Sequence, residues 1–339
     1  MSEQVWAAYV DTLGSADAIR YGLLPAPVAG PDDVLVDVLA TTVNWVDTFV
    51  RSGLFRTLVQ FPFVVGRDVV GTVHASAHGF TAGEPVWCNS LGHGGRQGAA
   101  AGRVAVPADR LYRLPDRVDP VEAVTAVHPA GTAYLGLFTH GRLRAGETVL
   151  VCGAAGNVGS ALVEFAVDAG ARVIATASAR DLEYCRSRGA AITLDYAAPD
   201  LTERIDAAAP SGVDVYLDTS GTNDLTVAVR LLAQRGRIVL LAGARTRPVL
   251  PAGKLYMKDG SVVGFVISHA TVAELAETAR EVNRMLAEGR LRPRSVERLP
   301  LAAMAEAHGR LERGTLHARR LALHPPPRPP HPASSPTLP

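Results

Sequence analysis

A glycine-rich turn between an apolar run and a helical run is the part of this chain best suited to chemistry. The apolar run 148–152 is short and β-branched, and residues 160–169 have the pattern of a helix. Between them lie Gly153, Ala154, Ala155, Gly156, Asn157, Val158 and Gly159. In such a turn Gly156 lets backbone approach a pyrophosphate, while Gly159 lets the helix pack on the strand and aim its N-terminus at the phosphates. The stretch therefore predicts a dinucleotide site, although Ala154 replaces the first glycine of the usual pattern.

The end of the next predicted strand, residues 172–178, indicates which dinucleotide is bound. NAD-binding proteins place an acidic residue there for the ribose hydroxyls. This chain has Ser178, Ala179 and Arg180 instead. A hydroxyl and a guanidinium suit a 2′-phosphate, and a charge-assisted hydrogen bond contributes about 1.5–3 kcal/mol. We therefore expect NADP(H). Asp181 makes the local charge mixed, and a solvated Arg180 on the first helical turn is the alternative.

Composition sets the broad class of the protein. The 339 residues, 47% of them hydrophobic, are enough for two domains. A net charge of +1 gives no electrostatic reason to expect nucleic acid or a membrane as the main partner. The three cysteines show no metal-ligand spacing, which favours a reduced, cytoplasmic chain. We also expect no signal peptide and no membrane-spanning segment.

The first third of the chain is predicted to be β-rich. Residues 33–39 and 68–74 are strand candidates in a barrel or sandwich that extends to about residue 117. Residues 92–98 contain four glycines and predict a loop, either a lid or a plain connection.

After residue 120 the pattern changes to alternating strands and helices. We predict a helix over 121–139 interrupted at Pro129, and a helix over 223–233 capped by Asn223. Further strands are expected at 191–195, 213–218, 236–241 and 261–267. Such βα units predict a parallel sheet with right-handed crossovers and a ligand beyond its carboxyl edge.

Two amphipathic helices follow, over 271–287 and 301–313, and should return to complete the first domain. The predicted domains are therefore 1–124 with 268–324, and 125–267. The Pro-rich tail 325–339 is expected to be disordered.

These pieces together resemble the zinc-independent quinone oxidoreductases of the medium-chain dehydrogenase/reductase superfamily, the group that includes zeta-crystallin. The resemblance extends from about Val5 to Leu323. The segments that carry it are residues 43–54, 65–73, the glycine turn, 255–260, Gly264-Phe265, Ala307-His308 and Glu312. It implies an α/β protein with a GroES-like β-rich substrate domain beside a doubly wound Rossmann domain. It also implies a cleft between the domains, a homodimer, and hydride transfer from NADPH to quinones or other conjugated carbonyl compounds.

The resemblance also implies which residues contact the cofactor. They are Asn44, Thr132, Gly156, Val158, Ser178, Arg180, Tyr196, Ser220, Gly243, Phe265 and Ile267, to which the turn residues Ala154, Asn157 and Gly159 and the C-terminal cation Arg319 are added. Tyr196 would stack near the adenine, and the backbone of Phe265 and Ile267 would meet the nicotinamide amide.

The expected catalytic residue is Asn44, which could hydrogen-bond the substrate oxygen or the cofactor ribose. Asp47 could relay a proton, but a structural role at the Arg51 turn is favoured. Trp45, Phe49 and Leu91 are the expected substrate pocket, and Phe49 replaces the tyrosine of many relatives.

We expect no metal site. Zinc-dependent relatives supply a cysteine near the Asn44 position and a histidine inside the Gly66-x-Asp/Glu motif, which reads Gly66-Arg67-Asp68 here. Zinc needs three or four ligands at tetrahedral spacing, and the sequence does not offer them.

Two other functions fit the same residues. One is an enoyl reductase that acts on acyl thioesters, which would need a wide groove. The other is a non-catalytic protein that senses NADPH. A panel of acceptors with NADPH separates all three.

Overall fold

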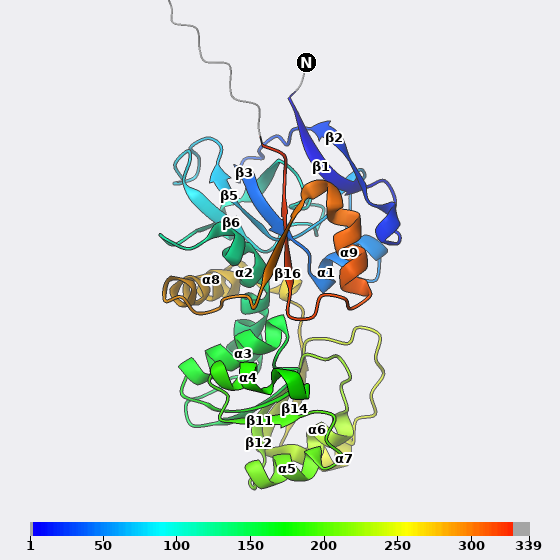
Figure 1. Ribbon diagram of the computed structural model, residues 1–339, viewed down its shortest axis with the longest axis vertical. Helices are drawn as coiled ribbons and strands as arrows, with labels where there is room; N and C mark the ends of the chain where they lie inside the picture. The colour runs from blue at the N-terminus through cyan, green and yellow to red at the C-terminus, as the bar shows by residue number, and fades with distance from the viewer. Residues whose placement is uncertain (1–2, 328–339) are drawn as a thin grey trace, which may run out of the picture.

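The computed structural model describes residues 3–327, which form two lobes (Figure 1). The N-terminal strands build one lobe and the middle of the chain builds the other. Of the predicted tail, residues 328–339 lie outside the described residues. In residues 3–327 no helix has both the length and the apolar character needed to cross a bilayer.

The second lobe is built on a six-stranded sheet in which every pair is parallel, with the order β11-β10-β9-β12-β13-β14. Its strands are β9 (Thr148–Cys152), β10 (Arg172–Ala177), β11 (Ile192–Asp195), β12 (Val213–Asp218), β13 (Leu232–Leu240) and β14 (Ser261–Gly264). The strand order reverses beside β9, because the chain adds β10 and β11 on one side of it and then β12 on the other. This confirms the doubly wound sheet and places a ligand site beyond the carboxyl end of β9.

Five helices connect these strands. They are α3 (Asn157–Asp168), α4 (Leu182–Ser187), α5 (Leu201–Ala208), α6 (Leu225–Leu231) and α7 (Ala252–Tyr256). The helix after the glycine turn starts three residues earlier than predicted, because Gly156 itself is its N-cap. The predicted cap of α6 was wrong: Asp224 accepts the Val227 N–H at 3.0 Å, while Asn223 occupies a left-handed turn at φ 53°.

The first lobe holds two antiparallel-rich sheets. The strands β1 (Gln4–Val10), β2 (Arg20–Pro25) and β4 (Phe63–Val64) form the smaller sheet, in the order β2-β1-β4. The larger sheet contains β3 (Asp33–Thr42), β5 (Val69–Val73), β6 (Pro85–Cys88), β7 (Arg103–Pro107), β8 (Tyr112–Arg113), β15 (Val296–Pro300) and β16 (Arg320–His324). The helix α1 (Trp45–Ser52) follows β3 directly. The β-rich first domain is thereby confirmed.

The helix α2 (Pro120–Tyr134) links the lobes. The predicted interruption at Pro129 was wrong, because the helix continues through this residue. It continues into a π-helical turn, Leu135–His140. Pro129 has no N–H to donate to the Thr125 carbonyl one turn earlier. That carbonyl instead accepts the Arg320 Nε at 3.0 Å, so the helix tolerates the proline.

The C-terminal segment returns to the first lobe. The helix α8 (Val272–Ala287) packs on α2, and α9 (Met304–Glu312) packs on α1. Strand β16 pairs antiparallel with β3, which Figure 1 shows as a red strand beside a blue one. The last Rossmann strand is shorter than predicted, since β14 ends at Gly264 and Ile267 begins a 3-10 turn, Ile267–His269.

Candidate functional site

A cavity of about 430 Å³ lies beyond the carboxyl ends of β9, β10 and β12 and reaches the start of β16. The expected site residues that line it are Trp45, Gly156, Asn157, Ser178, Arg180, Tyr196, Ser220 and Arg319. They come from six separate stretches of the chain and from both lobes. The sheet topology therefore brings together residues that the sequence indicates only one motif at a time.

The glycine turn is built for close packing on one side and for exposure on the other. A Cβ on Gly159 would lie 2.2 Å from the Gly153 carbonyl oxygen, so α3 can meet β9 only through a glycine here. Gly156 and Asn157 are exposed in the cavity wall at the first turn of α3. Free N–H groups and the positive end of the dipole at a helix N-terminus favour a phosphate.

The tip of β10 carries a cationic cluster. The Arg180 guanidinium is 70% exposed, and its Nη2 lies 3.1 Å from His317 Nδ1. Asp181 is buried beside it, accepts the Ser178 hydroxyl at 2.5 Å and pairs with Arg294 at 2.7 Å. Burial alone would raise the pKa of Asp181, but the bonds from Ser178 and Arg294 outweigh it and lower that pKa.

Asp181 is therefore an ionised carboxylate already engaged by protein donors, not a free acceptor for ribose hydroxyls. The negative charge that the sequence places beside Arg180 is therefore already paired within the protein. Arg294 pairs with Asp181, and His317 Nε2 lies 3.4 Å from it; neither had a signal in the sequence because both lie more than a hundred residues away.

The remaining cavity residues form its rim. Tyr196 is 58% exposed after β11. The Ser220 hydroxyl donates to Asp218 at 2.6 Å, and Arg319 reaches Glu297 at 3.1 Å. The rim thus carries an exposed tyrosine ring, a hydroxyl and a cation.

Eleven expected residues do not line this cavity: Asn44, Asp47, Phe49, Leu91, Thr132, Ala154, Val158, Gly159, Gly243, Phe265 and Ile267. Leu91 and Ala154 are core residues at 1% exposure. The Phe265 ring stacks on His140 at a centroid distance of 4.4 Å. Ile267 is buried next to Gly131, where a Cβ would lie 3.2 Å from its Cδ1. Phe49 lies against Trp45 on α1, with ring centroids 6.1 Å apart.

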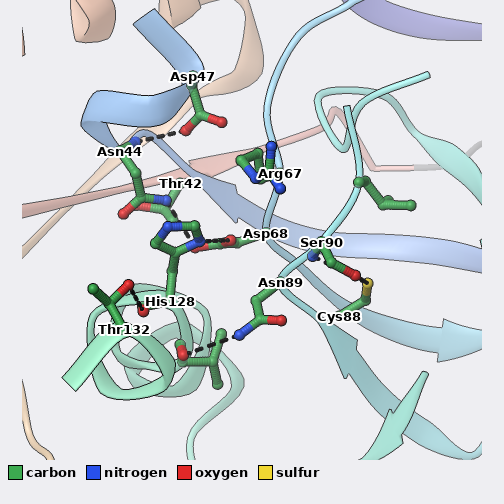
Figure 2. A network of polar contacts seen from close by, with 12 residues as sticks. Thr42, Asn44, Asp47, Arg67, Asp68, Cys88, Asn89, Ser90, His128 and Thr132 are labelled. Carbon is green, nitrogen blue, oxygen red and sulfur yellow. Dashed lines mark hydrogen bonds and ion pairs between the residues drawn. The ribbon is translucent and has the colours of Figure 1, made fainter. Parts of the chain in front are cut away.

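Asn44 belongs to a buried polar network (Figure 2). Its Nδ2 donates to Asp68 at 2.8 Å, and its Oδ1 accepts the Arg320 Nη2 at 2.9 Å. The second Asp68 oxygen lies 3.0 Å from His128 Nδ1. The capping box at the start of α1 also directs the Asp47 backbone N–H to the Asn44 side chain. The network therefore fixes the amide plane of Asn44.

Asp47 holds the start of α1, with its Oδ2 accepting the Asn44 N–H at 2.6 Å. It does not pin the Arg51 turn, because Arg51 instead bonds Gly14 and Glu312. Burial first, and then the charge of Asp68, raise the pKa of Asp47 to about 7. Its Oδ1 is buried and has no hydrogen-bond partner in the described part of the chain. This carboxyl can therefore hold or release a proton near neutral pH.

Arg67 was missed as a site residue. It is 1% exposed, its Nη2 lies 3.3 Å from His93 Nδ1, and its Nε and Nη1 have no partner within residues 3–327. A charged residue between the apolar pairs Val64-Val65 and Val69-Val70 is the signal that could have found it.

No group of three or more histidine, cysteine, aspartate or glutamate side chains among the described residues could hold a metal ion.

Comparison with known proteins places this geometry in a family. Residues 30–116 match the alcohol dehydrogenase GroES-like domain, and residues 157–284 match the zinc-binding dehydrogenase domain. The quinone oxidoreductase of Homo sapiens is 27% identical over 86% of this chain and 89% of its own length. The synaptic vesicle membrane protein VAT-1 homolog of Rattus norvegicus is 29% identical over 87% of this chain and 78% of its own length.

Solved structures agree with these matches. A quinone oxidoreductase from Pseudomonas syringae superposes with a TM-score of 0.84 at 25% identity, over 95% of this chain and 100% of that one. A mycobacterial protein solved as a complex with NADPH superposes with a TM-score of 0.81 at 27% identity, over 95% of this chain and 100% of that one. Sequence, domain order and fold lead to one conclusion: the chain belongs to the quinone oxidoreductase family of the medium-chain dehydrogenase/reductase superfamily.

Proposed function

We propose that this protein is an NADPH-dependent reductase of quinones or other conjugated carbonyl compounds. The observation that carries the proposal is the cationic tip of β10. Arg180 is exposed in the cavity wall there, while the adjacent carboxylate, Asp181, is engaged by Ser178 and Arg294. A 2′-phosphate suits such a site better than a ribose diol, which requires a free acceptor.

The residues that line the cavity fit the phosphate and adenine parts of the cofactor. The N-terminus of α3 beside Gly156 would hold the pyrophosphate, Ser178 and Arg180 the 2′-phosphate, and Tyr196 the adenine. The backbone near Phe265 and Ile267 would hold the nicotinamide amide. When bound, NADPH supplies a hydride. The protein's contribution is to position the acceptor and to exclude water from it.

The side chains favour a conjugated acceptor. Since the described residues offer no metal-ligand set, negative charge on the acceptor oxygen must be stabilised by hydrogen-bond donors such as Asn44. Conjugation spreads that charge over several atoms, so weaker donors suffice. Asp47, with its pKa near 7, can return a proton to the reduced product.

Arg180→Ala is expected to weaken NADPH binding by about 10- to 100-fold, because one charge-assisted contact contributes about 1.5–3 kcal/mol. NADH, which lacks the 2′-phosphate, should change less than about two-fold. Fluorescence titration with NADPH and with NADH measures the two changes in affinity. Arg186→Ala is the matched control, since Arg186 is also exposed but contacts Glu183 and Thr193 and does not line the cavity. Equal losses for NADPH and NADH would contradict the 2′-phosphate assignment.

The activity itself is tested by the loss of NADPH absorbance with a panel of quinones, enones and enoyl thioesters. We expect turnover with quinones and enones that a chelator does not change. Preference for the thioesters would reassign the protein as an enoyl reductase. Tight NADPH binding without turnover of any acceptor would reassign it as a sensor.

The proposal includes a homodimer formed through β14, because this strand is the edge of the Rossmann sheet. Light scattering on the purified chain should then give twice the 35.7 kDa mass of one chain. A monomer at all concentrations would contradict this part.

A further inference from the structure

A buried cation with two unused donors lies beside the Asn44 network. The Arg67 side chain is fully enclosed, at 1% exposure, yet its Nε and Nη1 donate to nothing within the described residues. Its single polar contact is Nη2 with His93 Nδ1, at 3.3 Å. A guanidinium stays protonated, so this position buries an uncompensated pair of charged donors. Such an arrangement is costly to folding and calls for a functional explanation.

The two nearby carboxylates do not use these donors. Asp68 accepts from the Asn44 amide and contacts His128 Nδ1, and Asp47 Oδ2 accepts from the Asn44 N–H. Both act on Arg67 only through space: burial lowers the pKa of the guanidinium, and the charges of Asp47 and Asp68 oppose this. Figure 2 shows Asp47 above Asn44, and Arg67 to the right of Asn44 and above Asp68. The unused oxygen of Asp47 and the unused nitrogens of Arg67 thus border the same network.

The same region meets the segment assigned to the nicotinamide. His93, the one partner of Arg67, also lies 3.2 Å through its Nε2 from the Ser268 carbonyl oxygen, next to Ile267. The Ser268 hydroxyl and the Asn89 Oδ1 are buried there and lack partners within residues 3–327. His93 therefore connects Arg67 in the first lobe with the 3-10 turn after β14.

We propose that Arg67 binds the carbonyl oxygen of the acceptor and stabilises the negative charge that forms on it during reduction. This rests on the proposed function. Hydride adds to the electrophilic carbon and forms the new C–H bond, and the displaced π-electron pair moves through the conjugated system to the oxygen. The acceptor gains two electrons, the nucleotide loses two, and Nε–H and Nη1–H of Arg67 donate to the resulting oxyanion. A proton from the Asp47 carboxyl or from water then completes the product.

Kinetics of Arg67→Met and Arg67→Lys test the role. Loss of an oxyanion donor lowers kcat by about 100- to 1,000-fold, so we expect a loss of this size for Arg67→Met with para-benzoquinone. Arg67→Lys keeps the charge but not the planar pair of donors and should recover part of it. NADPH affinity, measured by fluorescence, should change less than two-fold in either variant. For acceptors that already carry a carboxylate, an increase in KM without loss of kcat would show that Arg67 binds that group instead, and would overturn the oxyanion role.

Arg103→Met is the matched control. Arg103 is also buried, at 4% exposure, but Asp37 and Glu3 pair with it far from the network. We expect this variant to lose stability but to keep kcat. If Arg103→Met and Arg67→Met reduced kcat equally at temperatures where both remain folded, the effect would be a general one of losing a buried arginine, and the proposal would be wrong.

A second measurement needs no turnover. Para-nitrophenol is planar, and its absorbance distinguishes the neutral phenol from the phenolate, which mimics the oxyanion. With NADP⁺ present, the phenol bound to the wild-type protein should ionise about 1 to 3 pH units below its midpoint in Arg67→Met. Equal midpoints, or no binding to the wild-type protein, would overturn the proposal. If the shift is found while no acceptor is reduced, the anion site at Arg67 is supported and the proposed reductase activity is contradicted.

Discussion

Gly159→Ala is expected to reduce NADPH affinity by more than about 100-fold, or about 2.7 kcal/mol, and to destabilise the second lobe by about 1–3 kcal/mol. The added Cβ would lie 2.2 Å from the Gly153 carbonyl oxygen and 2.7 Å from the Ala154 Cα. Both are backbone atoms, so no side chain can rotate away. The start of α3 must separate from β9, which moves the N–H groups proposed to hold the pyrophosphate.

Alanine variants of two other glycines distinguish an effect on NADPH binding from an effect on packing. A Cβ on Gly156 would meet only the Gly153 oxygen, at 3.2 Å, and would project at the cavity wall. Gly156→Ala should therefore weaken NADPH binding while the unfolding temperature stays nearly unchanged. Gly253→Ala, within α7 and with nothing within 4 Å of the new Cβ, should leave binding unchanged. Fluorescence titration and thermal unfolding of the three variants give the comparison. Full NADPH affinity in Gly159→Ala would show that the glycine turn does not hold the cofactor.

Asp47→Asn and His308→Gln are expected to change the pH dependence of stability in opposite directions. The pKa of Asp47 rises from 3.8 to about 7 on folding. The protonated carboxyl therefore contributes its full stabilisation of the folded state below about pH 4, and this contribution is lost as the pH rises through 7. Burial first, and then the charge of Arg51, lower the pKa of His308 from 6.5 to about 3. The stability from neutral His308 is therefore complete above pH 6.5 and is lost as the pH falls toward 3.

Each contribution amounts to roughly 4 kcal/mol over its range, at about 1.36 kcal/mol per pH unit. Between about pH 4 and 6.5 the two nearly cancel, so the wild-type protein should show a flat profile from these groups. Asp47→Asn should gain stability as the pH rises through this window, and His308→Gln should lose it. Urea unfolding at several pH values measures the slopes. Parallel profiles for the wild type and both variants would mean that neither group changes its pKa on folding.

Local patterns in the sequence were enough to predict the sheet and the cofactor turn. The β-branched run at 148–152 and the glycines after it determine a strand, a turn and a helix within twenty residues. The absence of an acidic residue at the tip of β10 was also visible. These features depend only on residues close together in the chain, so a single sequence is enough to predict them.

Long-range pairing was not predictable. Arg320 reaches both Asn44 and the Thr125 carbonyl from the far end of the chain, which explains a continuous α2 where Pro129 predicted a break. Asp181 looked like a competing charge until Arg294 and His317 were placed beside it. The burial of Arg67 was not predicted, because it depends on which residues fold over this side chain. Each of these outcomes depends on tertiary contacts with residues distant in sequence.

The place of β16 in the larger sheet has a consequence for synthesis on the ribosome. The Rossmann strands come from the continuous stretch 148–264, so that lobe can fold as soon as those residues have emerged. Strand β3, made much earlier, must wait for residues 320–324 before its edge is covered. Nascent chains stalled before β16 should therefore carry a protease-resistant second lobe beside a first lobe that is still open to digestion and to chaperones.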